Sequence, residues 1–299
     1  MGNNKKKKKG KISLILLWIF IIIFLISTAF VVNELIIKPK KNSDTMLEAQ
    51  EMKDENLDYL SLLKTINPDI ISWINIPNTV INYPVVHPTK EEGDDFYLKH
   101  NYKKEYSAYG SIFVDLACGE GDDCLNSKNI ILHGHHMRNG SMFAQILNYE
   151  DLDFYKSSPI ITFNNEKWEV FAIIKVNTLT SQGEPFNYLQ YSFANNNSFL
   201  DFIYNVRERS LINTPVTINE NDQIMTMSTC SYEYKDFRTA VYARKVRPGE
   251  STDINTNLAS VNANALWPDC YYKDHNAIKP NLSDFNTALR SGKINWYAK

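Results

Sequence analysis

The pattern of apolar and polar positions first isolates one long apolar run near the start of the chain. Residues 12–32, ISLILLWIFIIIFLISTAFVV, contain no charged side chain. At about 1.5 Å per helical residue the run reaches roughly 30 Å, the thickness of the hydrocarbon core of a bilayer. It therefore predicts one transmembrane helix. A cleaved signal peptide is the alternative, since Ser27 and Ala29 give a small-x-small pattern, but the run exceeds the usual length of a signal core.

The next part of the chain, residues 33–67, is polar and predicts helices. Its apolar residues recur near a period of 3.6, as at Leu57, Leu60 and Leu63. Pro68 then limits any helix, because the residue before a proline is held away from helical backbone angles. A helical region between the membrane segment and the main domain follows from this pattern.

Residues 68–248 change to short β-type runs separated by turn residues. There are eight such runs: 70–77, 79–86, 110–115, 129–135, 159–163, 168–176, 223–229 and 239–246. Eight strands predict a mainly β fold, either a closed barrel or a sandwich. Two longer stretches, 141–158 and 197–210, interrupt the runs and predict helices.

The C-terminal part, residues 249–299, is polar and rich in asparagine before it ends in aromatic residues such as Trp267 and Trp296. Such a tail is either disordered or packed on the domain through its aromatics, and composition does not decide between the two. The sequence assigns it no role.

Charge supports an anchored protein outside the cytoplasm. Lys5–Lys9 and Lys11 supply six positive charges before the apolar run, whereas none of the 34 acidic residues lies there. Three lysines follow the run, at 38, 40 and 41. The excess predicts a cytoplasmic segment at 1–11, a single membrane pass at 12–32 and the remainder outside the cell. The acidic balance of that remainder argues against a nucleic-acid partner.

Four cysteines are available for chemistry. Cys118 and Cys124 flank the sequence GEGDD and either close a small disulfide loop or stay as free thiols. Cys230 follows the run IMTMST, which places it at or just past the end of a strand. A buried core thiol is the simplest interpretation, but the polar sequence SYEYKDF that follows favours a position at a mouth of the fold. There a thiol can act as a nucleophile if a base and a cation are near.

A histidine cluster supplies the candidate base. His133, His135 and His136 fall within four residues, directly after the apolar run NIIL. Gly134 lets the backbone approach a neighbour closely there. The cluster also resembles a zinc site, but no CxxC or HExxH pattern provides a further ligand, so we predict neither a metal nor another cofactor.

Arg238 is the candidate cation. It lies eight positions after Cys230 and opens the run RTAVYARKV, so the intervening turn makes the two strands neighbours. Its guanidinium can donate to an oxyanion or a substrate carbonyl. The alternative is a solvated ion pair with Glu233 or Asp236, which contributes little. Papain-like proteases carry Cys before His, and L,D-transpeptidases carry the arginine closer to the cysteine, so both fit poorly.

Together these segments resemble the sortase family, most closely class B. TMSTC at 226–230 is similar to the TLxTC signature around the sortase nucleophile, with Met227 in place of leucine. LHGHHM is similar to the x-G-H-x-M segment, which singles out His135, and Arg238 matches the arginine that opens the next strand. The segments NPDIISWINIPNTVINYPVV, YGSIFVD and GSMFAQILNYED also resemble class B sequence, and the similarity runs over residues 56–247.

The resemblance implies an eight-stranded closed sortase β-barrel with N-terminal helices, preceded by the membrane anchor. It implies catalysis by Cys230, His135 and Arg238, with Ser228 and Thr229 in substrate binding. The implied substrates are secreted proteins with a C-terminal sorting motif of the NPxTx or LPxTG kind, cleaved after threonine and joined to a peptidoglycan-precursor or pilin amine at a Gram-positive surface. Residues 181–198 are expected to help form the substrate pocket. A purely hydrolytic cysteine protease of this fold, or a non-catalytic surface protein such as an adhesin, is the alternative.

Overall fold

The computed structural model describes residues 3–55 and 58–298, with side chains from residue 14 onward. Its contacts divide the chain into two compact units, residues 1–48 and 49–299. In the first unit, α1 (Asn3–Val32) continues through a π-helical turn (Asn33–Ile37) into α2 (Lys38–Glu55), which crosses into the second unit. The apolar run predicted to be a transmembrane helix lies within α1.

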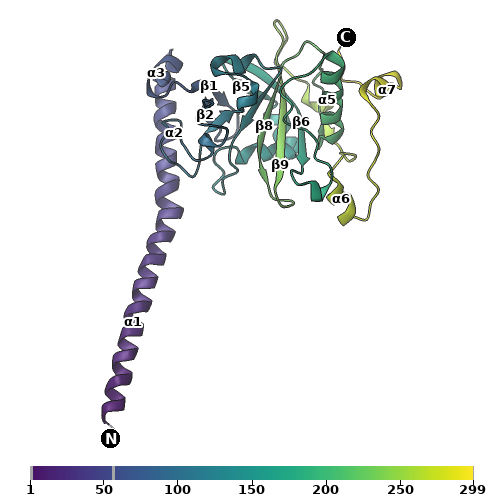
Figure 1. Ribbon diagram of the computed structural model, residues 1–299. Helices are drawn as coiled ribbons and strands as arrows, with labels where there is room; N and C mark the ends of the chain where they lie inside the picture. Colours follow the sequence, from purple (N-terminus) through teal and green to yellow (C-terminus); the bar gives the residue numbers. More distant parts are fainter. Residues whose placement is uncertain (1–2, 56–57, 299) are drawn as a thin grey trace. The chain divides into compact units, whose positions relative to one another are not determined.

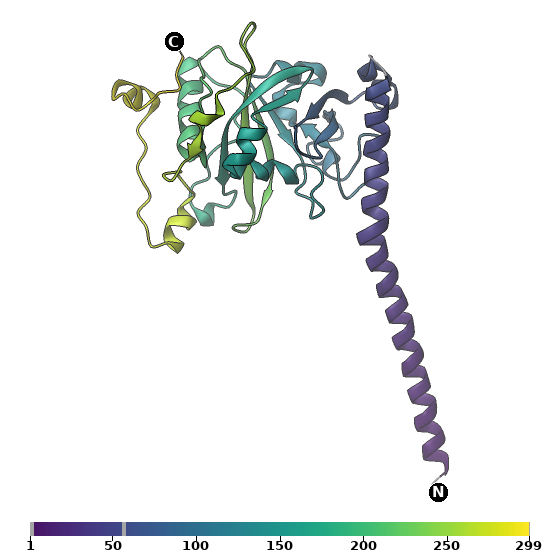
Figure 2. The same ribbon diagram turned by 180° about the vertical axis from the view of Figure 1, so that it is seen from behind.

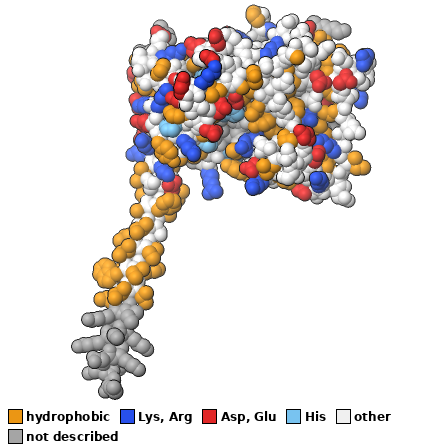
Figure 3. All heavy atoms as spheres, in the orientation of Figure 1, with side chains coloured by type: hydrophobic (Ala, Val, Ile, Leu, Met, Phe, Trp, Pro, Cys, Tyr) orange, Lys and Arg blue, Asp and Glu red, His pale blue; other side chains and the backbone are white. Residues whose placement is uncertain are grey.

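The described part of α1 is apolar on all sides. Large side chains such as Trp18, Phe24 and Ile26 are exposed, and Figure 3 shows hydrophobic groups all along this stretch. The helix is long and apolar enough to cross a bilayer. It is therefore a candidate membrane anchor, although a signal sequence near an N-terminus has the same properties. The side chains of the predicted basic segment, Lys5–Lys9 and Lys11, lie outside the described residues.

Helix α3 (Tyr59–Ile66) forms where the 3.6-residue period predicts one. It buries Tyr59 and Leu63, and the ring of Tyr59 meets Trp73 of the first strand edge-on at 5.9 Å. The helix ends at Asn67, whose backbone is extended, directly before Pro68. Leu57 of the predicted period lies outside the described residues.

The eight predicted β-runs form eight strands of one closed barrel (Figures 1 and 2). A closed barrel leaves no strand edge unpaired, and the sandwich is not formed. Around the barrel the order is β1-β2-β3-β4-β8-β9-β6-β5. The strands are β1 (Ile70–Asn75), β2 (Asn82–Val86), β3 (Ile112–Val114), β4 (Asn129–His133), β5 (Ile160–Phe163), β6 (Glu166–Val176), β8 (Ile224–Ser231) and β9 (Phe237–Lys245).

Two of the barrel's pairings, β2 with β3 and β4 with β8, are parallel, and the others are antiparallel. The β4–β8 pair matters most for function. It places the end of β4, where the histidine cluster begins, beside the end of β8, where Cys230 lies.

One face of the barrel is covered by α5 (Asn196–Arg209). Asn195 caps this helix and forms a reciprocal capping box with Ser198, which fixes where the helix begins. Its apolar face, with Phe199 and Phe202, packs against the strands β6 and β9. Strand β6 is accordingly buried on both faces from Trp168 to Val176, which fits the apolar run at 170–174 in its middle.

The stretch 141–158 is not one helix, contrary to the prediction. It contains a 3₁₀ segment (Ala144–Glu150) and a short helix, α4 (Leu152–Ser157). The physical reason is Asp151, whose side chain accepts hydrogen bonds from the amides of Asp153 and Phe154 and so starts a new helix. Local side-chain capping here overrides the apolar period.

The C-terminal tail packs on the domain, which answers the question that composition left open. Phe285 of α7 (Phe285–Arg290) and Trp296 join the apolar cluster around α5. Two backbone hydrogen bonds, Ile218 N to Trp296 O and Ala298 N to Ile218 O, fix the end of the described chain. A short pair of strands, β7 (Ile212–Asn213) and β10 (Ser260–Val261), and α6 (Asp269–Asp274) complete the tail's region.

A buried ion pair links β6 to β9. Arg244 is 1% exposed and binds Glu169, which is 5% exposed, and also Glu250. We expect Arg244→Met to lower the free energy of unfolding by about 3–5 kcal/mol, because Glu169 is left buried without its partner. Thermal unfolding of the full chain in detergent measures the loss.

The matched control removes both buried charges. Glu169→Leu combined with Arg244→Met is expected to recover much of the lost stability, since two apolar side chains can replace a buried pair at little cost. Equal instability of the single and double variants would contradict this account.

Candidate active site

Cys230 is the next-to-last residue of β8 and is partly exposed. Strand β9 returns antiparallel to β8, and the register pairs Cys230 directly with Arg238. The prediction that the two strands are neighbours and bring these residues together is confirmed. Side chains opposite each other in a sheet share one face, so thiol and guanidinium lie on the same side of the barrel wall.

Arg238 keeps most of its donors free for a ligand. Its Nη1 donates to the backbone oxygens of Asp236 and Phe237, at 3.3 and 3.0 Å. Among residues 14–55 and 58–298, no carboxylate lies within ion-pair distance of it, so the predicted alternative of a salt bridge with Glu233 or Asp236 is wrong. Glu233 instead binds the buried Lys175. The guanidinium therefore stands beside Cys230 as a charged, unneutralised donor.

The histidine segment follows β4 and passes close to the core. A side chain at Gly134 would bring its Cβ to 2.5 Å from Ile112 Cδ1 and 2.8 Å from the ring of Phe143, so only glycine fits there. Thr229, one residue before Cys230, donates to the Gly134 carbonyl at 2.7 Å. This bond connects the segment that carries His135 to the strand that carries Cys230.

His135 and His136 face different surroundings. His135 Nε2 lies 2.7 Å from the Leu98 carbonyl. A carbonyl only accepts, so Nε2 carries the hydrogen, and Nδ1 of the neutral ring keeps its lone pair. His136 instead donates from Nδ1 to the Cys230 carbonyl at 2.9 Å, and its ring lies against Tyr232.

A cavity of about 410 Å³ brings the candidate residues together. His135, Cys230 and Arg238 all line it, whereas His136 does not. The other lining residues are Asp94, Asp95, Leu98, Phe113, Asp115, His133, Gly134, Thr178, Tyr188, Leu189, Ser228 and Thr229. The sequence-predicted set thus shares one concave site, the usual form of a binding pocket.

The two residues predicted for substrate binding lie in the cavity wall and are almost fully buried. Ser228 Oγ is 3.3 Å from the hydroxyl of Tyr188, and Thr229 bonds Gly134 as described. Tyr188 and Leu189 come from the stretch 181–198, which was expected to contribute to the pocket. Sequence patterns did not mark Leu98 or Asp115, because the first acts through its backbone and the second meets the site only in the folded barrel.

The described residues form no candidate metal cluster around this site. Within the described part of the chain, no group of three or more His, Cys, Asp or Glu side chains is arranged to hold a metal ion. Cys118 and Cys124 are both free and buried, so the small disulfide loop is not formed. Burial raises the pKa of the Cys118 thiol to about 11 and that of Cys124 to about 12. Neither thiol is activated as a nucleophile.

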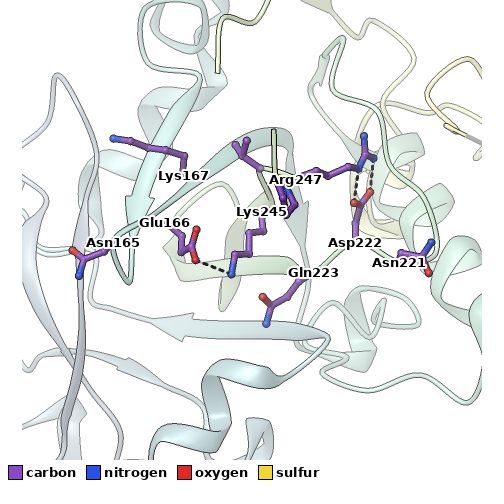
Figure 4. Close-up of a pocket in the computed structure, with 10 residues that line it drawn as sticks. Asn165, Glu166, Lys167, Asn221, Asp222, Gln223, Lys245 and Arg247 are labelled. Atoms are coloured by element: carbon purple, nitrogen blue, oxygen red, sulfur yellow. Dashed lines mark hydrogen bonds and ion pairs between the residues drawn. The ribbon is translucent and has the colours of Figure 1, made fainter. Parts of the chain in front are cut away.

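A second cavity, of about 580 Å³, lies where the ends of β8 and β9 distant from Cys230 meet the β5–β6 turn (Figure 4). Its charges largely neutralise one another: Lys245 binds Glu166 at 3.2 Å and Arg247 binds Asp222 at 2.6 Å. It contains no cysteine or histidine. The chemistry of the molecule is therefore concentrated at the Cys230 end of the barrel.

Comparison with known proteins agrees with this geometry. The family model described as the sortase domain matches residues 74–246, more than half of the chain. The sortase B of Listeria monocytogenes is 34% identical over 191 residues, which cover 62% of this chain and 71% of that relative. The chain belongs to the sortase family, class B. Sortases of this class are cysteine transpeptidases, and so is this protein.

Solved sortases share the fold. The Staphylococcus aureus sortase B–substrate complex superposes with a TM-score of 0.61 at 27% identity, covering 71% of this sortase and 99% of that chain. The Clostridium perfringens sortase B gives 0.56 at 32% identity, covering 62% of this sortase and 99% of that chain. The eight-stranded sortase barrel inferred from the sequence is thereby confirmed.

Proposed function

We propose that this sortase is a membrane-anchored enzyme that cleaves a C-terminal sorting motif after threonine and transfers the protein to a cell-surface amine. The observation that carries the proposal is the cross-strand pair of Cys230 and Arg238 in a cavity that also contains His135. A nucleophile, a fixed cation and an imidazole are the groups that acyl transfer through a thioester requires.

Each residue has a distinct role in the proposed reaction. The Cys230 thiolate attacks the carbonyl carbon of the motif's threonine, and Arg238 donates hydrogen bonds to the oxygen that becomes negative. The proton of the Cys230 thiol passes to His135, which gives it to the leaving amine, so the C–N bond breaks and a thioacyl-enzyme remains. The incoming amine then attacks that carbonyl, His135 takes a proton from its nitrogen, and the C–S bond breaks to release the thiolate. Ping-pong kinetics are expected.

The proposed location is the cell membrane, with residues 1–11 in the cytoplasm and the barrel outside. The exposed apolar helix supports an anchor, and the six lysines before it support this orientation. An anchor would keep the enzyme where secreted substrates and lipid-linked acceptors meet. Protease protection of the barrel in intact protoplasts would contradict the orientation.

The test uses the full chain in detergent, a panel of peptides with LPxTG-, NPxTN- and SPxTG-type motifs, and triglycine as the amine. Mass spectrometry follows the products. Cleavage after threonine with transfer to the amine supports a transpeptidase and identifies the motif. Cleavage with water alone, even with excess amine, would favour a hydrolytic cysteine protease, and no product from any motif would favour a non-catalytic surface protein.

Arg238 offers a direct test of oxyanion stabilisation. We expect Arg238→Lys to lower the rate of thioacyl formation by about 10²-fold, since lysine keeps the charge but loses the planar fork of donors. Single-turnover release of the leaving peptide measures this rate. Alkylation of Cys230 by iodoacetamide is the control, and an equal fall in alkylation would mean that Arg238 acts on the thiol instead.

A further inference from the structure

A second imidazole lies in the active-site cavity beside that of His135. His133 is the last residue of β4, and the parallel register places it next to Ser228 of β8. Ser228 precedes Cys230 by two positions, so His133, Ser228 and Cys230 lie on one face of the sheet. Positions two residues apart along a strand, such as Ser228 and Cys230, are separated by about 6.6 Å. His133 therefore lies beside the residue whose side chain is the next one to that of Cys230 on this face of β8.

Asp115 determines which nitrogen of this imidazole carries the hydrogen. Its carboxylate oxygen accepts a hydrogen bond from His133 Nε2 at 2.8 Å, and its other oxygen accepts from the Ala117 amide. Burial alone would raise the pKa of Asp115, but the hydrogen bonds from His133 and Ala117 outweigh burial and hold this pKa below its ordinary value. The carboxylate therefore stays ionised and keeps the hydrogen of the neutral ring on Nε2.

The other ring nitrogen of His133 is left for a ligand. Nδ1 of the neutral ring carries a lone pair, and it has no hydrogen-bond partner among residues 14–55 and 58–298. The imidazole is held between Asp115 and the ring of Phe113, whose centroid is 5.3 Å away. A carboxylate that orients an imidazole and leaves its second nitrogen basic is the arrangement of a general base.

The proposed reaction needs one more base than His135 provides. In forming the thioacyl-enzyme, His135 gives up one proton to the leaving amine, and it can take back only one. An acceptor amine enters largely as an ammonium, since an α-amino group has a pKa of about 7.7–8.0. To become an amide nitrogen it must lose two protons, so the second proton needs another acceptor.

We propose that His133 is a further catalytic residue, which deprotonates the acceptor ammonium, and that Asp115 is its positioning residue; this rests on the proposed function. The ammonium gives one proton to His133 Nδ1, and the freed lone pair forms the C–N bond to the thioacyl carbon. His135 takes the second proton from nitrogen as the C–S bond breaks, and the bonding pair leaves with sulfur as the Cys230 thiolate. His133 then returns its proton to water.

The charged and titratable groups that share the cavity with His133 are few. They are Asp94, Asp95, Asp115, His135, Tyr188, Cys230 and Arg238. The three carboxylates give an incoming ammonium a favourable approach to the cavity, and one of them, Asp115, contacts His133. His87 adds a further imidazole near Asp115, but it does not line the cavity.

The test separates the two half-reactions of the full chain in detergent, with His133→Gln and Asp115→Asn. Release of the leaving peptide measures acylation, and decay of the thioacyl-enzyme measures transfer. We expect His133→Gln to acylate as wild type does and to transfer to triglycine about 10²-fold more slowly near pH 7. Asp115→Asn should show a smaller loss in the same step. His275→Gln, in the tail, is the matched control.

Hydroxylamine distinguishes a base from a structural residue. Hydroxylamine is already neutral near pH 7, so transfer to it should be unchanged in His133→Gln. Raising the pH above the pKa of the triglycine amine should restore transfer to triglycine in this variant, because the amine then enters without its extra proton. Three results for His133→Gln would overturn the proposal. They are an equal fall in the transfer rate with hydroxylamine and triglycine, a fall in the acylation rate, and an unchanged transfer rate with triglycine. Absence of acylation in wild type would overturn the proposed function and this inference with it.

Discussion

Replacing Cys230 by alanine is expected to abolish thioacyl formation and transfer together, with a fall in turnover of more than about 10³-fold. Cys230 is the only cysteine that lines the cavity among the residues the structure describes, and its cross-strand partner is Arg238. The measurement is single-turnover release of the leaving peptide with the best motif of the panel. Trapping of the acyl-enzyme by mass spectrometry identifies the modified residue.

The other cysteines supply the controls for that experiment. Iodoacetamide should label Cys230 first, because Cys118 and Cys124 are buried with raised pKa values, and burial also raises the pKa of Cys270. Cys270→Ala, in the tail, should retain full turnover. Labelling of Cys230 no faster than Cys270 would indicate a thiol that is not activated and would count against the proposed mechanism.

The second large effect concerns the two adjacent histidines. We expect His135→Gln to lower turnover by about 10²–10⁴-fold, because it removes the general acid of the first step. His136→Gln should keep most of the activity, since this side chain lies outside the cavity and only donates to the Cys230 carbonyl. The pair is a matched comparison, with the same substitution at adjacent positions.

The readout for the histidines is the rate of acylation over a range of pH, which compares the two variants with wild type. If His136→Gln lost activity and His135→Gln kept it, the assignment of the general acid would be wrong. A loss in both variants, accompanied by a lower unfolding temperature, would instead indicate that the histidine segment had collapsed. Thermal unfolding of each variant therefore accompanies the kinetics.

The strands of this fold could be predicted from the sequence because each is a short apolar run closed by turn residues. All eight runs form strands of the barrel. Their order could not be predicted in the same way, since the alternation of side chains identifies a strand but not its partner. The parallel β4–β8 pair in particular depends on a long connection through five other α-helices and strands, α4, β5, β6, α5 and β7.

The residues of the candidate site also differ in how far the sequence could predict their positions. Cys230 and Arg238 could be placed together because a short turn joins their strands. His135 was chosen over His136 by resemblance to a known segment. The structure distinguishes the two directly, because His135 lines the cavity and His136 does not. Asp115 and the Leu98 carbonyl, which bind the imidazoles of His133 and His135, were not foreseen because they come from other segments, 18 and 37 positions away.

The hydrogen bond from the His136 ring to the Cys230 carbonyl joins residues 94 positions apart, and it connects the segment that follows β4 to β8, the parallel neighbour of β4. Contacts of such long range form late, because the entropy of closing a long loop must be overcome first. The His135 imidazole and the Cys230 thiol are carried by the same two segments, so they stay apart until β4 and β8 have paired, and catalysis requires the closed barrel. In a refolding experiment, activity should therefore return with the phase in which the barrel closes, and not with the earlier formation of local helices.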